Sequence, residues 1–386
     1  MPLVSSPHAR SFARATRCRF EIVNRRSVLV GGGAAALAGA AVAIVGIDRA
    51  DAMDAYATAV ARTRGALDAD PGMIDLVRFA TLAPSGHNTQ PWRFRLTADR
   101  MTILPDLKRR TPVVDPDDHH LFVALGCAAE TLAIAAAARG HPGQITFDPT
   151  EGGAASFVFG GARRPEPALF AAIARRRSSR TVYDGRPLAN TDLSALAQAA
   201  AMPGVDLMLL TDRPRVDHVR DLVIAGNSAQ LASDAFMREL KHWIRFSPHH
   251  ALQTGDGLFA ASSGSPALPE WLGPGMFDAT FHAKSENNKY ARQLGSSAGI
   301  AVFVGHAADA ETWIAVGRAA QRFQLQATAL GIAHAFVNQP VEVARLRPEL
   351  ATLIGLPGRR PDLVLRFGHG PTLPYSARRA VSAVLV

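Results

Sequence analysis

Apolar residues recur at helical spacing in two long stretches of the chain, Gly126–Gly140 and Gly317–Gly331. Each stretch ends at a glycine, which can adopt the left-handed conformation that closes a helix. Each is followed by a short run rich in strand-forming residues, 144–147 in the first case and 333–337 in the second. The pattern predicts two buried helices that each lead into a strand.

These two stretches also match each other position by position. Gly126, Gly140 and Pro149 have counterparts 191 positions later, at Gly317, Gly331 and Pro340. A second pairing relates 75–96 to 192–210, because each begins as a helix, passes a proline and ends in a strand. We therefore expect an internal duplication, with a first half over 53–160 and a second half over 161–386. Chance similarity between alanine-rich helices is the alternative.

Further strands are predicted at 93–96, 205–210, 300–304 and 363–367. The apolar helices are expected to cover these strands.

The N-terminal segment has the pattern of an export signal. Arg25 and Arg26 precede twenty uncharged residues, 28–47, and a small-x-small sequence at 50–52 that suits cleavage. This resembles a twin-arginine signal peptide over residues 1–52, so we expect export through that machinery to the periplasm or cell envelope. The alternative is a retained membrane anchor, because an apolar run of this length can span a bilayer. The twin-arginine route carries folded proteins, which suits a protein with a bound cofactor.

Composition and charge favour a globular protein with a small anionic ligand. The chain has 386 residues, 48% of them hydrophobic, and a net charge of +9. Seven arginines and three acidic residues give the first 52 residues +4 of this charge, which leaves +5 for the remainder. No basic stripe with interleaved aromatic residues is present, so no nucleic-acid partner is expected. Cys127 lies in an apolar helical run and is predicted to be a buried small hydrophobe.

Three segments resemble the nitroreductase family of flavoproteins. The first is Pro84-Ser85-Gly86-His87-Asn88-Thr89-Gln90-Pro91-Trp92, and the second is Arg176-Arg177-Ser178-Ser179-Arg180. The third is Gly368 with Pro371 and the tail Ser376-Ala377-Arg378-Arg379. With the duplication and the export signal, the chain most resembles the Acg-like branch of that family.

This resemblance implies a nitroreductase-like α+β sandwich, with one central mixed sheet flanked by helices, that binds FMN. It assigns the FMN phosphate to Arg176, Arg177 and Ser178, and it places Arg180 near the N1/O2 edge of the flavin ring. A further set of residues would contact the ring or close over the phosphate: Ser85, Gly86, Asn88, Arg378 and Arg379. The alternatives that involve no ligand are a solvated basic helix start at 175–180 and a frayed, charged tail at the C-terminus.

Family members usually complete the flavin site across a homodimer, with one motif from each subunit. Here both motifs lie in one chain, and each half carries the motif that the other lacks. The resemblance therefore implies a monomer that acts as a pseudo-dimer with one complete site.

The segment from about 246 to 292 departs from the family pattern. It is rich in Gly, Pro and Ser, yet it also holds aromatic residues, among them Phe246, Phe259, Trp271, Phe277 and Phe281. We expect a packed lid over the flavin, which would leave little room for nicotinamide. The histidines at 249, 250 and 282 lack a carboxylate or cysteine at ligand spacing, so no metal is expected.

The function implied is an FMN-dependent oxidoreductase that passes hydride or electrons from NAD(P)H or another reductant to a nitro compound or quinone. No side chain is assigned a catalytic role, because the flavin carries the chemistry. The alternatives are a lid-covered FMN-binding protein with little turnover and an envelope structural protein without flavin.

Overall fold

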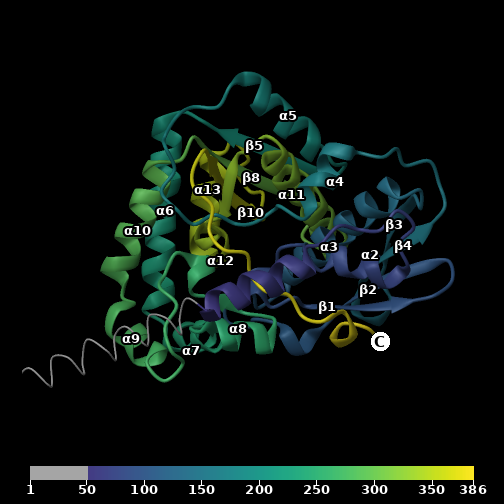
Figure 1. Ribbon diagram of the computed structural model, residues 1–386. Helices are drawn as coiled ribbons and strands as arrows, with labels where there is room; N and C mark the ends of the chain where they lie inside the picture. The colour runs from purple at the N-terminus through teal and green to yellow at the C-terminus, as the bar shows by residue number, and fades with distance from the viewer. Residues whose placement is uncertain (1–50) are drawn as a thin grey trace, which may run out of the picture. The chain divides into compact units, whose positions relative to one another are not determined.

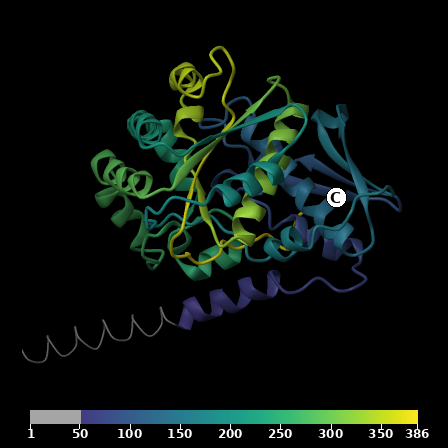
Figure 2. The ribbon, with the colours of Figure 1, turned by 90° about the horizontal axis from the view of Figure 1, so that it is seen from above.

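The computed structural model describes residues 51–386, so the expected signal peptide lies outside the described residues. Residues 52–386 form one compact unit. This unit begins with a helix over residues 51–63, drawn in purple in Figure 2.

Four strands from the first third of the described chain form one sheet. They are β1 (Trp92–Leu96), β2 (Arg100–Pro105), β3 (Gly143–Asp148) and β4 (Ala154–Phe159), in the order β1-β2-β4-β3. All three pairings are antiparallel. In β1, Trp92 and Phe94 are buried while Arg93 and Arg95 are exposed, as expected for a strand with one face on the core. Trp92 is thus a core residue.

A second sheet contains four later strands. They are β5 (Val205–Leu210), β8 (Gly299–Gly305), β9 (Ala333–Phe336) and β10 (Leu363–Gly368), in the order β5-β8-β10-β9, again with antiparallel pairings only. Strands β8 and β10 are buried along their whole length. When strands are counted along the chain, both sheets have the order first, second, fourth, third.

The α+β sandwich class is therefore confirmed, but its sheets are divided differently from the expectation of one mixed sheet. The strand at 93–96 lies in the first sheet and the other three expected strands lie in the second. The short turn 97–99 explains the difference, because it folds β1 directly onto β2. A parallel pairing joins two strands of two residues each, β6 (Ile244–Arg245) and β7 (Leu258–Phe259), and a single parallel bridge joins Phe94 to Leu385.

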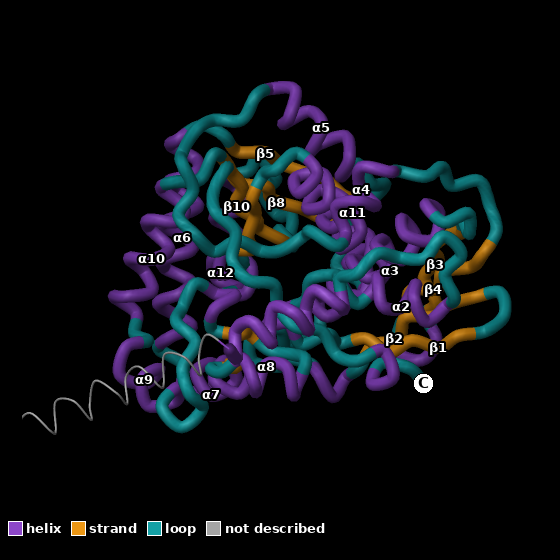
Figure 3. Tube along the Cα trace, in the orientation of Figure 1, coloured by secondary structure: helices purple, strands orange, loops and turns teal. Residues whose placement is uncertain are grey.

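Two long helices cross at the centre of the core, α3 (His119–Ala138) and α11 (Ala310–Ala329). A β-carbon added to Gly126 would lie 2.0 Å from the Ile314 carbonyl oxygen, and one added to Gly317 would lie 2.0 Å from that of Val123. Glycine is therefore required on both sides of the crossing. Figure 3 shows this helix pair between the two groups of strands. Helix α3 is long and apolar enough to cross a membrane, but 94% of its apolar window is buried in the protein core.

The remaining helices cover these layers (Figure 1). They are α2 (Met73–Ala80), α4 (Pro167–Ile173), α5 (Asn190–Ala200), α6 (Arg213–Leu231), α7 (Asp234–Trp243), α8 (Pro248–Thr254), α9 (Gly273–Thr280), α10 (Ala283–Gly295), α12 (Gln339–Glu342) and α13 (Arg347–Leu353). Side chains of α6, α10 and α13 pack with β8 and β10 in a second apolar cluster. The expected lid segment is largely helical, as α8, α9 and most of α10. Its Phe259 and Phe277 are buried, whereas Trp271 is 82% exposed.

Candidate functional site

The loop after α2 has an unusual backbone. His87, Asn88 and Gln90 have φ angles of 47°, 53° and 53°, in the left-handed region that non-glycine residues rarely adopt. Side-chain bonds hold it there. The backbone N–H of Gln90 donates to Ser85 Oγ at 2.9 Å, and Asn88 Nδ2 donates to the carbonyl oxygens of Gly257 and Ala377. Strain supported in this way often marks a binding site.

The arginine cluster predicted from the sequence follows the end of α4 instead of starting a helix. Arg176 is 3% exposed, and its guanidinium donates to the Leu82 carbonyl oxygen and to Gln324. The Arg177 guanidinium lies 3.6 Å from the centre of the Tyr375 ring and donates to the Leu373 carbonyl oxygen. A solvated basic helix start is therefore the wrong interpretation of this segment.

The loop and the arginine cluster meet at a narrow pocket of about 50 Å³. Five arginines line it, together with Ser85, Asn88 and Ser178, and no carboxylate is among the described residues of its wall. The arginines are Arg64, Arg176, Arg177, Arg180 and Arg378.

Burial lowers the pKa of all five guanidinium groups, and for Arg64, Arg176 and Arg378 the charges of neighbouring arginines lower it further. The pKa of Arg176 falls to about 10 and that of Arg378 to about 9. The pKa of Arg64 is also lowered, by burial and then by the charges of Arg378 and Arg176. A bound dianion would relieve both effects, because an opposite charge favours the charged form.

Arg64 was not predicted from the sequence. It follows the helix 51–63, far from both motifs, and its guanidinium donates to the Ala174 carbonyl oxygen and lies 4.1 Å from the centre of the Tyr375 ring. A lone arginine after a helix carries no local signal for a binding site.

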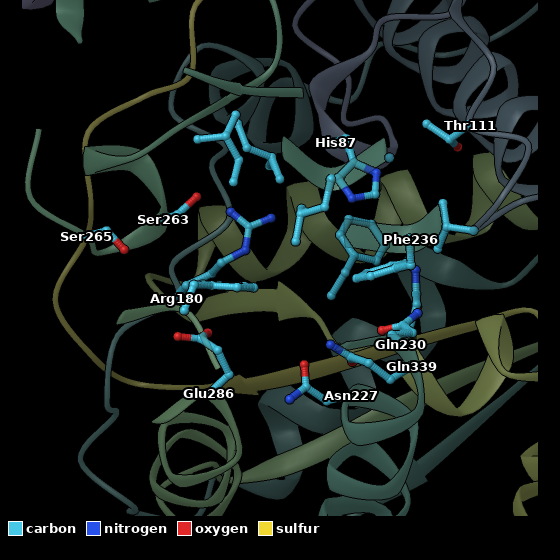
Figure 4. Close-up of a pocket in the computed structure, with 18 of the residues that line it drawn as sticks. His87, Thr111, Arg180, Asn227, Gln230, Phe236, Ser263, Ser265, Glu286 and Gln339 are labelled. Carbon is cyan, nitrogen blue, oxygen red and sulfur yellow. The ribbon is translucent and has the colours of Figure 1, made fainter. Parts of the chain in front are cut away.

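Arg180 differs from the other arginines of the pocket. Within the part of the chain that the structure describes, its guanidinium has neither a hydrogen-bond acceptor nor an acidic partner; only its carbonyl oxygen is bonded, to Gln293. Burial lowers its pKa. Figure 4 shows its side chain in the open space with His87 and Ser263 around it. Arg180 is therefore available to a ligand.

The C-terminal arginines have separate positions. Arg378 donates to the carbonyl oxygens of Thr81, Leu82 and Ala83, so it braces the start of the loop from inside the pocket wall. Arg379 donates to the carbonyl oxygens of Gln90 and Ala383, and it lines neither cavity. The structure thus brings together all the predicted site residues except Arg379.

A larger cavity of about 500 Å³ adjoins the narrow pocket and shares five wall residues with it. The shared residues are Pro84, Ser85, Arg180, Leu258 and Phe336. The apolar side chains in the wall of the larger cavity include Phe236, Leu240, Phe246, Met276, Phe277 and Phe281. The polar side chains include Asn227, Gln230, Glu286, Lys289, Gln339 and Glu342, and Figure 4 labels four of these, Asn227, Gln230, Glu286 and Gln339. Its size and mixed lining suit a small organic ligand.

The floor of the larger cavity comes from α3. Cys127 is 1% exposed, as predicted, and burial raises the pKa of its thiol to about 12, so it stays protonated. His87 also faces the cavity, and burial lowers the pKa of its imidazole to about 4. Neither His87 nor the two cavity residues His120 and Glu342 was given a role from the sequence.

One group of potential metal ligands lies beside this floor. Asp115, His119 and His120 have ligand atoms within 4.8 Å of one another. The Asp115 carboxylate already accepts the backbone N–H groups of His120 and Leu121, and His119 Nε2 lies 3.0 Å from an oxygen of Asp362. These contacts account for the cluster as part of the start of α3.

Fold and site together define an α+β protein with an arginine-lined pocket that adjoins a partly apolar cavity. The model of the nitroreductase family matches residues 173–369, which is half of the chain, and the chain belongs to that family.

Several proteins of Mycobacterium tuberculosis are similar to this chain. One from strain H37Rv, provisionally named an NAD(P)H nitroreductase, is 26% identical over 334 residues, which are 80% of this chain and 90% of the relative. The protein acg, provisionally named in the same way, is 23% identical over 329 residues, 80% of this chain and 93% of its own length.

Solved nitroreductases are also similar. The protein from Desulfitobacterium hafniense DCB-2 with bound FMN aligns with a TM-score of 0.36 at 16% identity, over 55% of this chain and 95% of its own. The FMN-dependent nitroreductase NfnB of Mycobacterium smegmatis, in complex with NADPH, aligns with a TM-score of 0.35 at 15% identity, over 56% of this chain and 91% of its own.

Proposed function

We propose that this chain is an FMN-dependent oxidoreductase of the nitroreductase type that takes electrons from NAD(P)H and passes them to an electron-poor nitro compound or quinone. The observation that carries the proposal is the narrow pocket with five arginines and no carboxylate, which adjoins a 500 Å³ cavity beside the loop Ser85–Asn88. Family membership and the names of the relatives support the same reaction class.

The residues fit FMN. A phosphate dianion matches the guanidinium groups of Arg64, Arg176 and Arg177 and the hydroxyl of Ser178, because charge-assisted bonds to phosphate are strong and geometrically matched to arginine. Arg180 borders both cavities, which places its free cation where the ring would continue from the phosphate chain. When bound, FMN supplies two-electron hydride transfer. The protein binds it, positions it and excludes water.

Asn88 has a different role in this arrangement from the one that the family resemblance implied. Its Nδ2 donates to two backbone carbonyl oxygens and its Oδ1 accepts from Arg378. The amide is therefore occupied by the protein. We assign Asn88 to holding the loop and leave the ring contacts to the backbone at Ser85 and Gly86.

The apolar side chains of the larger cavity favour turnover over sequestration of the cofactor. Phe236, Leu240, Met276, Phe277 and Phe281 line it, and none of them lines the narrow pocket. A flavin anchored in the narrow pocket would leave these side chains to a second ligand with an aromatic or aliphatic body. The helical segment 246–292 supplies much of this wall. In the alternative, a closed FMN-binding protein, the same segment would cover the bound flavin and keep a second ligand out.

We further propose that the site is complete in one chain because the mature protein is a duplicated, dimer-like monomer. Support comes from the equal strand order of the two sheets and from the reciprocal contacts of Gly126 and Gly317. Two positions that the duplication relates differ in their surroundings. Cys127 lines the larger cavity, whereas its counterpart 191 positions later, Arg318, forms an ion pair with Glu130 at 3.0 Å.

Export by the twin-arginine route also remains a proposal, supported by the pattern of residues 24–52 alone. A doubly substituted Arg25→Lys/Arg26→Lys chain is expected to stay in the cytoplasm while the unaltered chain appears in the envelope fraction. Equal distribution of the two would contradict this route.

The enzymatic proposal is tested by mixing the FMN-loaded protein with NADPH in the absence of oxygen, and then with a quinone or nitroaromatic compound. We expect loss of the oxidised-flavin absorbance with NADPH and its return with the acceptor. A flavin that NADPH reduces but no acceptor reoxidises would favour the closed binder. A flavin that only dithionite reduces would rule out the nicotinamide donor.

A further inference from the structure

Two titratable side chains, His120 and Glu342, lie in the wall of the larger cavity but not in the narrow pocket. His120 is in the first turn of α3 and Glu342 is the last residue of α12. Neither has a place in flavin binding as described above.

Glu342 is a carboxyl group without a cationic partner among the described residues. Gln230 Nε2 donates to its Oε2 at 2.6 Å, which leaves Oε1 to the cavity. Burial raises the pKa of Glu342, the charges of Asp115 and Glu239 add to this, and His120 and the Gln230 bond oppose it. The carboxyl therefore keeps its proton to a higher pH than a solvated glutamate does.

His120 lines the same cavity as Glu342. Its Nε2 is buried and has no hydrogen-bond partner in the described part of the chain. Its ring centre lies 4.6 Å from that of His119, and its Nδ1 lies 3.9 Å from Asp115 Oδ1. Burial lowers its pKa, as do His119 and Arg360, whereas Asp115 and Glu342 raise it. The imidazole is thus neutral, with one ring nitrogen unused.

We propose that Glu342 is the proton donor of the acceptor half-reaction and that His120 restores its proton. This inference rests on the proposed function. An acceptor that receives a hydride from the reduced flavin gains a negative charge on oxygen or nitrogen. The O–H bond of Glu342 breaks, a new O–H or N–H bond forms on the acceptor, and a carboxylate remains. A proton from water then reaches the carboxylate through His120.

The test compares two kinds of oxidant on the dithionite-reduced, FMN-loaded protein by stopped-flow absorbance without oxygen. A quinone needs protons as well as electrons, whereas ferricyanide needs electrons only. We expect Glu342→Gln to slow reoxidation by the quinone by about 100-fold, the usual scale of general acid catalysis, and to leave the ferricyanide rate unchanged. Glu342→Asp should restore part of the quinone rate, and the exposed Glu349→Gln should match the wild type.

A second measurement needs no cofactor. Because the folded-state pKa of Glu342 is raised, the folded protein binds this proton more tightly than the unfolded chain does. Stability from this group is lost as the pH rises from the unfolded pKa through the folded one. In the flavin-free protein, the melting temperature of Glu342→Gln should therefore fall less over that range than that of the wild type.

Each outcome decides the inference. An equal loss with both oxidants would show a structural defect and overturn it, as would an unchanged quinone rate; the proposed function would survive both results. If the wild-type flavin passes electrons to ferricyanide but to no quinone or nitro compound, the proposed function and this inference both fail.

Discussion

The five arginines of the narrow pocket differ in what their guanidinium groups bond to. Arg176, Arg177 and Arg378 donate to backbone carbonyl oxygens and so stabilise the pocket as well as charging it. Arg180 has no such partner in the described residues, although it borders both cavities. Its guanidinium is therefore free to bind the proposed flavin.

Replacing Arg180 should affect cofactor binding and little else. Loss of a charge-assisted contact costs about 1.5–3 kcal/mol, so Arg180→Ala should weaken FMN binding by about 10- to 100-fold in a fluorescence titration. The melting temperature of the flavin-free protein should not fall. Arg175→Ala is the matched control, because Arg175 is exposed and lines neither cavity. Equal affinities for all three proteins would remove Arg180 from the site.

Asn88 provides the opposite case at the residue scale. Asn88→Ala would leave the carbonyl oxygens of Gly257 and Ala377 without this donor and would place alanine at a positive φ. We expect a loss of about 1–3 kcal/mol in the free energy of unfolding of the flavin-free protein, measured with urea. Unchanged stability with lost FMN affinity would instead make the amide a direct flavin contact.

At the scale of elements, the crossing of α3 and α11 holds the core together. Gly317→Ala would bring a β-carbon within 2.0 Å of the Val123 carbonyl oxygen, and rigid backbone cannot yield cheaply. We expect a loss of stability of about 1–3 kcal/mol, seen as a lower melting temperature. Gly295→Ala in α10 meets nothing within 4 Å and should leave the protein as stable or more so. Similar behaviour of the two variants would contradict the crossing.

The sequence predicts the positions of the strands better than it predicts which strands pair with each other. The strands at 205–210 and 363–367 were located well because apolar runs and turn residues mark strand ends locally. The sheet to which 93–96 belongs was not predicted, since pairing depends on the turn 97–99 and on long-range packing. Trp271, expected within a packed lid, is exposed.

The residues of the candidate site likewise fall into those that the sequence predicts and those that only the folded structure brings together. The two motifs predicted the loop at 84–92 and the arginines at 176–180 because each is a continuous run with a recognisable pattern. Arg64, His120 and Glu342 are single residues from three distant elements, and only the folded chain brings them to the cavities. Arg379 shows the reverse error: it follows Arg378 in the sequence, but its side chain points to Gln90 and Ala383.

At the scale of the whole molecule, the proposed flavin site takes both of its motifs from one chain, and the proposal therefore predicts that no second chain is needed to complete it. Light scattering after gel filtration of the FMN-loaded protein should give the mass of one chain. A stable dimer in which dissociation releases FMN would show that a second chain contributes to the site.

The central claim is that one chain holds one FMN. The most direct measurement is the visible absorption spectrum of the purified protein, followed by quantification of the FMN released on denaturation. We expect the absorption bands of oxidised flavin and one released FMN per chain. A protein that is colourless and takes up no added FMN would contradict it, and two FMN per chain would contradict the single open site.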